Sequence, residues 1–376
     1  MTTVTDVMAA RGHEQVVFVA DAPTGLRAVI AVHSTALGPS LGGIRFWTYR
    51  SEDDAVRDVL RLSEAMTLKA AAAGLHQGGG KAVVLIDDPD APRTVELLHA
   101  MGRAIDELGG RYLAAEDVGA TTRDMDLIAE ITPWVTGVDP AAGGSGDPSP
   151  VTAVGVVAAM RAVLRELDGA PGLAGRRVAI QGVGHVGGHL ARLLSAAGAS
   201  VVVADANPAR AQAVADAVGG EVVDTATILE VECDILAPCA LGGVLDDLTA
   251  SRLQCRSVCG AANNQLSDDT IDDLLATRQV LYAPDFVANA GGIINIAEEF
   301  VGYSHDRALE RAEGIEQTMT RVFALARERS TAPGAAATAM ARARLDAEGA
   351  GRRWRPGDPA AWTGGAPLQR LRPATS

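Results

Sequence analysis

The chain has 376 residues, which is long for one domain and comfortable for two. Hydrophobic residues make up 48% and charged residues 21%, a balance that indicates a globular chain and excludes a disordered one. The net charge of −14 and the aromatic content of 3% argue against nucleic-acid binding through a basic surface or stacked aromatic rings.

Strands and a helix alternate in the first part of the chain. β-Branched runs at 14–21 and 25–34 predict two strands joined by a turn, and Ser51 with the acids that follow it predicts the start of a helix over 51–66. A further strand is predicted from Lys81, then a helix over 93–108 and a strand over 111–117. We expect these elements to form an α/β domain over residues 1–140.

Residues 66–84 hold two lysines, Lys69 and Lys81, on either side of three consecutive glycines. The stretch is not a Walker A phosphate loop, because Leu75 stands where that motif needs its first glycine and Ala82 where it needs a hydroxyl. Two interpretations stay open here. The glycines form a tight turn between surface lysines, or they admit a small substrate against the backbone between two ammonium groups.

Turn residues at 143–150 indicate a domain boundary, and strands then alternate with helices over 141–330. This order predicts βαβ units and a parallel, doubly wound sheet. Helices at about 330–348 are expected to complete the first domain. The tail over 349–376 is rich in Arg, Gly and Pro and is expected to be poorly ordered.

The glycines Gly182, Gly184 and Gly187 form a G-x-G-x-x-G pattern between a predicted strand and a predicted helix. Asp205 ends the next strand, where a carboxylate would accept hydrogen bonds from an adenosine ribose. We therefore predict a dinucleotide site in a Rossmann-type domain and favour NAD, since an acid repels the 2′-phosphate of NADP. Arg210 keeps NADP as an alternative. The predicted loop also contains Val183, His185 and Val186.

The segments GPSLGGIRFW, MTLKAAAAGLHQGGGKAVV, AAEDVG, GAANNQL and YAPDFVANAGGIINIAEE resemble the amino-acid dehydrogenase family that acts on glutamate, leucine, phenylalanine and valine. The resemblance covers about residues 13–330. It implies a cleft between the two domains and NAD-dependent, reversible deamination of an amino acid to a 2-oxo acid and ammonium. It also implies a homo-oligomer. We expect no nucleic-acid partner because of the net charge and the low aromatic content, and no membrane partner because no run is long and apolar enough to span a bilayer.

By this resemblance Lys69 binds the substrate carboxylate, Lys81 is the general base and Asp117 exchanges protons with substrate and water. A lysine must have a lowered pKa to act as a base near neutral pH, and burial beside a like charge supplies such a shift. On this reading the glycines admit the amino acid between the two lysines. The resemblance further implies cofactor contacts near the nicotinamide from Thr152, Asn263 and Arg45.

Leu41 occupies the position where glutamate-specific relatives carry a lysine for the side-chain carboxylate, so glutamate is disfavoured. The resemblance implies an apolar pocket for the substrate side chain, lined by Leu41, Gly42, Met66, Ala115, Ile293 and Ile296. We expect leucine, valine or isoleucine as substrate. Ala70, Ile44 and the segment at 285–292 keep phenylalanine, or a larger aromatic amino acid, as the alternative. An inactive NAD-binding sensor is a remoter alternative, since Lys69, Lys81 and Asp117 are all present.

Four cysteines, Cys233, Cys239, Cys255 and Cys259, form no C-x-x-C pair and have no histidine cluster near them in sequence. We therefore expect no metal site and buried thiols in a reducing compartment. The N-terminal residues have no basic and apolar pattern of a signal peptide, and no run is apolar and long enough to span a bilayer. A cytoplasmic protein is expected.

Overall fold

The computed structural model describes residues 3–89, 91–351 and 353–354, and the chain divides into two compact units. Among the described residues, the first unit comprises those within 3–147, 296–305 and 341–354, and the second comprises 148–295 and 306–340. Most of the tail predicted over 349–376 lies outside the described residues. Within those residues, no helix combines the length and the apolar character that a membrane span requires.

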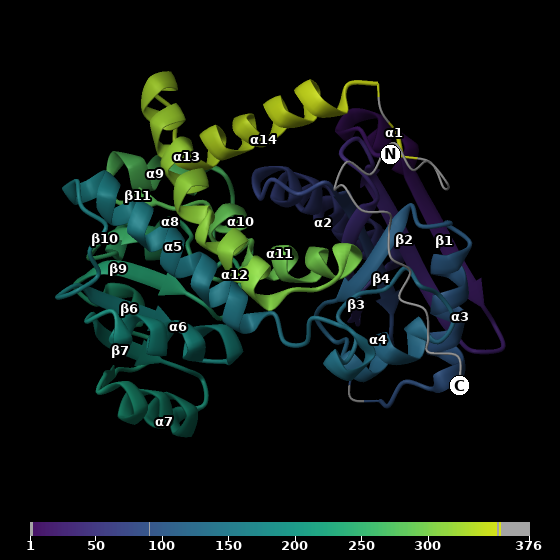
Figure 1. Cartoon of the computed structure of the whole chain (residues 1–376), viewed down its shortest axis with the longest axis horizontal. Helices are drawn as coiled ribbons and strands as arrows, with labels where there is room; N and C mark the ends of the chain where they lie inside the picture. The colour runs from purple at the N-terminus through teal and green to yellow at the C-terminus, as the bar shows by residue number, and fades with distance from the viewer. Residues whose placement is uncertain (1–2, 90, 352, 355–376) are drawn as a thin grey trace. The chain divides into compact units, whose positions relative to one another are not determined.

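The first unit is built on a five-stranded sheet with the order β1-β2-β4-β3-β5, in which Figure 1 labels β1, β2, β4 and β3. Its strands are β1 (Gln15–Asp21), β2 (Leu26–Ser34), β3 (Ser40–Trp47), β4 (Gly78–Leu85) and β5 (Tyr112–Glu116). β1, β2 and β4 pair antiparallel, whereas β3 runs parallel to both β4 and β5. The strands predicted at 14–21 and 25–34 are confirmed. β3 was not predicted, because proline and glycine around its start are depleted in strands.

Helices cover both faces of this sheet. They are α1 (Val4–Arg11), α2 (Glu52–Ala72), α3 (Val95–Asp106) and α4 (Thr122–Ala129), followed by the short turn η1 (Pro140–Ala142). α2 packs on one face through Val56, Val59 and Leu60, and α3 and α4 close the other face with a larger apolar cluster. The Ser51 side chain caps α2 as expected, but the helix continues past the predicted end to Ala72, so Lys69 lies in its last turn.

The second unit contains a fully parallel six-stranded sheet with the order β11-β10-β9-β6-β7-β8, which confirms the doubly wound prediction. Its strands are β6 (Arg177–Gln181), β7 (Ser200–Ala204), β8 (Glu221–Val222), β9 (Cys233–Pro238), β10 (Cys255–Val258) and β11 (Leu281–Tyr282). Because all strands run the same way, their carboxyl ends meet at one edge of the sheet, where ligands bind in such folds.

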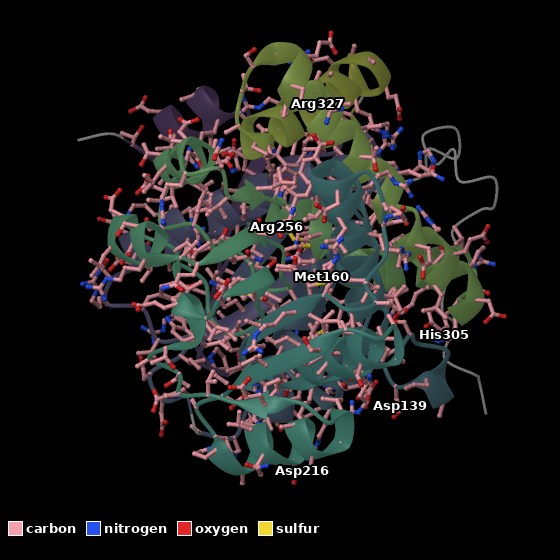
Figure 2. All side chains as sticks on the ribbon, turned by 90° about the vertical axis from the view of Figure 1, so that its left-hand side faces the viewer. Asp139, Met160, Asp216, Arg256, His305 and Arg327 are labelled. Carbon is pink, nitrogen blue, oxygen red and sulfur yellow. The ribbon has the colours of Figure 1, made fainter. Side chains whose placement is uncertain are left out.

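Helices surround this sheet, with apolar residues of α8 and α9 in its core. They are α5 (Ser149–Asp168), α6 (His185–Ala196), α7 (Pro208–Val218), η2 (Ile228–Glu230), α8 (Asp247–Arg252), α9 (Thr270–Thr277), α10 (Asp285–Ala288), α11 (Gly291–Ala297), α12 (His305–Glu313) and α13 (Ile315–Arg329). Arg256, labelled in Figure 2, lies near the amino end of β10 and pairs with Asp168 at 2.6 Å and with Asp234 at 3.2 Å.

Two segments distant in sequence complete the first unit. In η3 (Glu298–Val301), the buried Glu299 carboxylate accepts hydrogen bonds from the backbone N–H groups of Gly137 at 3.1 Å and Ser145 at 2.8 Å. In the C-terminal segment, Trp354 is buried and its backbone N–H donates to Thr35 Oγ1 at 3.1 Å. The first unit is therefore completed by two segments that follow, in the sequence, the two parts of the second unit.

Helix α14 (Pro333–Gly349) begins in the second unit and ends in the first. Its N-terminus is capped by a side chain from another element, since the Gly334 N–H donates to Asp272 Oδ2 at 2.7 Å. Asp272 is only 4% exposed, and its Oδ1 has no hydrogen-bond partner in the described part of the chain. Burial, with a smaller contribution from Asp273, raises the pKa of Asp272 to about 6.

Asp272→Asn is expected to stabilise the protein at pH 7 and not at pH 4. The folded-state pKa lies above the unfolded value, so this carboxyl favours folding at low pH, and that contribution is lost as the pH rises from about 4 to about 6. Two pKa units correspond to about 3 kcal/mol at neutral pH. The measurement is the urea-unfolding midpoint of both proteins from pH 4 to 7. Asp216→Asn, at an exposed position of α7 that does not contribute to the pKa of Asp272, is the control. A pH-independent difference would contradict the assignment.

Candidate active site

The three glycines at 78–80 begin strand β4 and are all buried. A Cβ atom on Gly79 would lie 2.1 Å from the backbone nitrogen of Thr67 in α2, and one on Gly78 would lie 1.8 Å from the Ser34 carbonyl oxygen. Protein atoms therefore fill the space that the missing side chains leave. The prediction that these glycines admit the substrate is wrong: they let α2 and β2 pack closely on the strand that carries Lys81.

Lys81 lies two residues beyond Gly79 on β4, so its side chain projects from the same face of the sheet, toward α2. Its Nζ lies 2.6 Å from Asp117 Oδ2, and the lysine side chain is only 6% exposed. Asp117 directly follows β5, and strand β3 runs between β4 and β5. The strand order thus brings together two predicted site residues that are distant in sequence.

Gly43 on β3 makes this approach possible. A Cβ atom there would lie 2.5 Å from the Asp117 Cβ and 2.9 Å from the Glu116 carbonyl oxygen. The absence of a side chain lets Asp117 lie over the middle strand and reach Lys81 on the far side. Sequence reasoning singled out Gly42 and missed Gly43. Gly42 instead lets β3 approach β4, since its Cβ would lie 1.8 Å from the Gly80 oxygen.

The Lys81–Asp117 pair is strongly perturbed by burial. Burial lowers the pKa of Lys81, and the Asp117 carboxylate opposes this shift. Burial alone would raise the pKa of Asp117, but the charges of Lys81 and Arg45 outweigh it and lower that pKa to about 2. The Asp117 carboxylate is therefore ionised at neutral pH. Lys81 loses its proton more readily than a lysine in water does.

The other residues predicted for the substrate divide between the two units. Lys69 and Met66 are half-buried and one turn apart on α2, while Leu41 and Ala115 are buried on β3 and β5. The register pairs Gly43 with Ala115, which places Ala115 beside the Lys81–Asp117 pair. Ile296 belongs to the first unit and Ile293 to the second. Their roles in one pocket stay predictions.

The glycine pattern in the second unit has the local geometry of a dinucleotide loop. Gly182 adopts a left-handed φ of +90°, and a Cβ on Gly187 would lie 2.0 Å from the Gly182 oxygen. Gly184 is the N-cap of α6, and the nearest atom to a Cβ there is an Arg210 nitrogen at 3.7 Å. The N-terminus of α6 therefore offers backbone N–H groups beside open space, which fits a pyrophosphate.

Asp205 is tied to this loop. Its Oδ2 accepts from the Val183 N–H at 2.9 Å and its Oδ1 accepts from the Asn207 N–H at 2.8 Å. Val183 is buried, whereas His185 is exposed and Val186 half-buried on the first turn of α6. Arg210 Nη1 lies 3.8 Å from Asp205 Oδ2. The loop and Asp205, which is predicted to bind the ribose, thus lie together at the carboxyl edge of the sheet.

The three residues predicted near the nicotinamide differ in their surroundings. Thr152 donates its hydroxyl to the Pro148 oxygen at 2.9 Å in the first turn of α5. Asn263 Oδ1 accepts from Asn289 Nδ2 at 2.9 Å, so the Asn263 amide group is held in one orientation. Arg45 lies in the first unit, where its guanidinium pairs with Asp117 and Asp58. Sequence reasoning missed Asp58 and Asn289.

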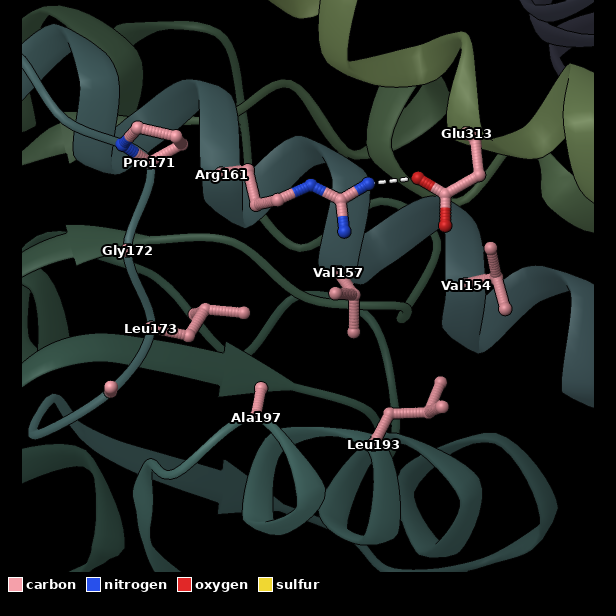
Figure 3. Close-up of a pocket in the computed structure, with 10 residues that line it drawn as sticks. Val154, Val157, Arg161, Pro171, Gly172, Leu173, Leu193, Ala197 and Glu313 are labelled. Atoms are coloured by element: carbon pink, nitrogen blue, oxygen red, sulfur yellow. Dashed lines mark hydrogen bonds and ion pairs between the residues drawn. The ribbon is translucent and has the colours of Figure 1, made fainter.

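A hollow of about 470 Å³ on the second unit is separate from these groups (Figure 3). Val154 and Val157 of α5, Leu193 and Ala197 of α6 and the loop at 171–174 line it. Arg161 at its rim is already paired with Glu313 and Glu316. The hollow includes none of the residues predicted for catalysis or cofactor binding, and among the described residues no cluster suited to a metal ion occurs.

Comparison with known families identifies the chain. Residues 13–133 match the model of the Glu/Leu/Phe/Val dehydrogenase dimerisation domain, and residues 143–209 and 204–347 match that of Glutamate/Leucine/Phenylalanine/Valine dehydrogenase. The chain belongs to the Glu/Leu/Phe/Val dehydrogenase family. The resemblance that the motifs indicated is thereby confirmed, and the family match covers both units of the structure.

Relatives in the Glu/Leu/Phe/Val dehydrogenase family match nearly the whole chain. The leucine dehydrogenase of Thermoactinomyces intermedius is 47% identical, covering 91% of this chain and 93% of its own. The valine dehydrogenase of Streptomyces coelicolor is 48% identical, covering 89% and 92%. The crystal structure of L-tryptophan dehydrogenase from Nostoc punctiforme superimposes with a TM-score of 0.82 at 36% identity, covering 92% of this chain and 99% of that one.

Proposed function

We propose that this family member catalyses the NAD-dependent, reversible oxidative deamination of branched-chain L-amino acids to 2-oxo acids and ammonia. The observation that carries the proposal is the buried Lys81–Asp117 pair, with 2.6 Å between Nζ and Oδ2. A buried lysine of lowered pKa has the property that a general base requires. The names of the leucine and valine dehydrogenases that match about nine-tenths of the chain support the substrate class.

In the proposed mechanism, Lys69 pairs with the substrate carboxylate and Lys81 takes a proton from the substrate ammonium group. The bound dinucleotide supplies the acceptor for the hydride that leaves Cα. Lys81 passes this first proton to water and is neutral again. It then removes a proton from the water that attacks the resulting iminium carbon and returns that proton to the nitrogen. The carbon–nitrogen bond breaks as the hydroxyl group gives up its proton to Lys81, and ammonia leaves. Asp117, ionised beside Lys81, exchanges the protons of these steps with substrate and water.

Leu41 supports the choice of an apolar substrate, because a glutamate side chain would place an unpaired carboxylate against a fully buried leucine. The competing assignment is an aromatic amino acid, which the likeness to the tryptophan dehydrogenase favours. The test is a panel of initial rates with leucine, isoleucine, valine, phenylalanine, tryptophan and glutamate.

We expect kcat/KM for the best branched-chain substrate to exceed that for phenylalanine by at least about tenfold, a difference of about 1.4 kcal/mol in transition-state binding. A higher value for an aromatic substrate would move the assignment to that class. No reduction of the cofactor with any amino acid would favour the inactive NAD-binding sensor.

The proposed cofactor is NAD, bound by the loop over 182–187 and by Asp205. Asp205→Ser is expected to raise KM for NAD by about tenfold and to improve kcat/KM for NADP relative to NAD, because the charge that repels a 2′-phosphate is removed. Because Asp205 also accepts from Val183 and Asn207, loosening of the loop would weaken both cofactors together. Unchanged KM values for both would show that Asp205 does not face the ribose.

We also propose a homo-oligomer in the cytoplasm. β1 is an edge strand of the first sheet and exposes 52% of Phe18, and the matching family model is described as a dimerisation domain. An exposed edge with an aromatic side chain is a surface that natural proteins usually cover. The four cysteines are free thiols, which suits a reducing compartment.

A further inference from the structure

We propose that Arg45 is a positioning residue that holds the Asp117 carboxylate against Lys81, and that Asp58 and Tyr49 hold Arg45 in turn. The inference rests on the proposed function, because it assigns these residues to the proton-transfer pair of that reaction. All of them belong to the first unit: Arg45 is on β3, Asp58 is on α2, and Tyr49 lies between these two elements.

Arg45 and Lys81 share one oxygen of Asp117. Arg45 Nε lies 3.1 Å from Asp117 Oδ2, the same atom that lies 2.6 Å from Lys81 Nζ. Asp117 follows the last residue of β5, so the pairing of that strand with β3, which ends at Glu116, does not include it. Two donors on one oxygen leave the carboxylate little freedom to rotate away from the lysine.

The guanidinium of Arg45 is fixed at its other end by Asp58. Arg45 Nη1 donates to Asp58 Oδ2 at 3.0 Å, and the Tyr49 hydroxyl donates to the same oxygen at 2.8 Å. The planar fork of an arginine can meet two carboxylates at once with fixed geometry, which the ammonium of a lysine cannot reproduce. Arg45 and Asp58 are about one-fifth exposed, so solvent screens these contacts only partly.

The charges around Lys81 make the role testable by sign. Lys81 is faced by Asp117 after β5, by Arg45 on β3 and by Asp58 on α2. Burial is the main cause of the lowered pKa of Lys81; Arg45 lowers it further, whereas Asp117 and Asp58 raise it. Removing Arg45 and removing the charge of Asp58 should therefore shift the pKa of Lys81 in opposite directions.

The test compares pH profiles of kcat/KM for leucine in Arg45→Gln, Arg45→Lys, Asp58→Asn and Tyr49→Phe. Arg45→Gln should lower kcat by at least about tenfold. It should also move the acidic limb of the profile to higher pH by about half a unit or more, because the pKa of Lys81 rises. Asp58→Asn should move the acidic limb to lower pH, because the pKa of Lys81 falls. In Arg45→Lys the acidic limb should lie at the wild-type pH, since the positive charge remains. Its kcat should fall, since the planar guanidinium that contacts both carboxylates is lost.

Arg61→Gln is the matched control, because Arg61 pairs with the other oxygen of Asp58, Oδ1, at 3.0 Å and is half exposed. It should change kcat less than about twofold. Tyr49→Phe keeps the shape of the side chain and removes only the bond to Asp58, so it remains informative if Arg45→Gln does not fold. It should lower kcat about threefold and leave the acidic limb in place, because the charge of Asp58 remains.

Two outcomes overturn the inference. Lower unfolding midpoints with wild-type kcat and wild-type pH profiles would show that Arg45 and Asp58 only stabilise the fold. A shift of the acidic limb in the same direction in Arg45→Gln and in Asp58→Asn would contradict the proposed effect of their charges on Lys81. Failure of the proposed function has a different signature, which is retained turnover in Lys81→Ala. If that variant is inactive while Arg45→Gln behaves as wild type, the proposed function stands and only the role of Arg45 falls.

Discussion

Lys81→Ala is expected to lower kcat for leucine by about three orders of magnitude, because proton removal by a positioned base contributes about 10²–10⁴-fold. No second base lies against the substrate amine in the proposed mechanism, and Asp117, with its pKa at about 2, is too weak a base to replace the lysine. The measurement is kcat at saturating leucine and NAD, together with NAD affinity by fluorescence titration.

NAD affinity is the internal control for Lys81→Ala, because the predicted cofactor loop lies in the other unit. Lys81→Met is the matched variant, since it keeps an unbranched side chain in a site that is only 6% exposed and removes the amine alone. We expect both variants to be inactive and folded. Retention of more than about a tenth of wild-type kcat in either one would exclude Lys81 as the base.

The second large effect is expected at Gly43. In Gly43→Ala the added Cβ would lie 2.5 Å from the Asp117 Cβ, so the aspartate must move away from Lys81 or β3 and β5 must separate. We expect kcat to fall by about a hundredfold or more, since a displacement of about 1 Å at a reacting group has such consequences. Overpacking should also lower the free energy of unfolding by about 1–3 kcal/mol.

Gly172→Ala is the control for this substitution, since nothing lies within 4 Å of a Cβ there and its backbone is not left-handed. It should leave both kcat and stability near the wild-type values. The informative quantity for Gly43→Ala is kcat of the folded variant at a temperature well below its unfolding midpoint. Activity above about a third of wild type would mean that Asp117 does not need its place over β3.

The second unit could be predicted from sequence in more detail than the first. Its strands are continuous β-branched runs separated by helices, a pattern that specifies a parallel sheet without knowledge of tertiary contacts. The glycines at 182 and 187 likewise report local requirements, a left-handed φ and a close helix–strand approach. Local rules were sufficient there because every pair of neighbouring strands except β6 and β9 is consecutive in the chain.

The first unit could not be predicted to the same depth. Lys81 and Asp117 were assigned by resemblance, and their contact depends on the strand order β4-β3-β5, which no local pattern specifies. The glycines at 78–80 argue against a strand by propensity, and packing against α2 overrides that preference. Asp58 lies outside the apolar face of α2, so the sequence predicts a side chain exposed to solvent. In the structure its side chain is only 18% exposed and pairs with Arg45.

The division of the chain into interleaved segments has a consequence for protein engineering. A chimera that exchanges the contiguous block 148–340 with a relative would also exchange residues 296–305, which belong to the other unit. The foreign segment would have to reproduce Glu299, whose carboxylate holds the backbone of Gly137 and Ser145. Recombination that respects the structure uses four crossover points instead, so that 148–295 and 306–340 are grafted together while 296–305 keeps its native partner.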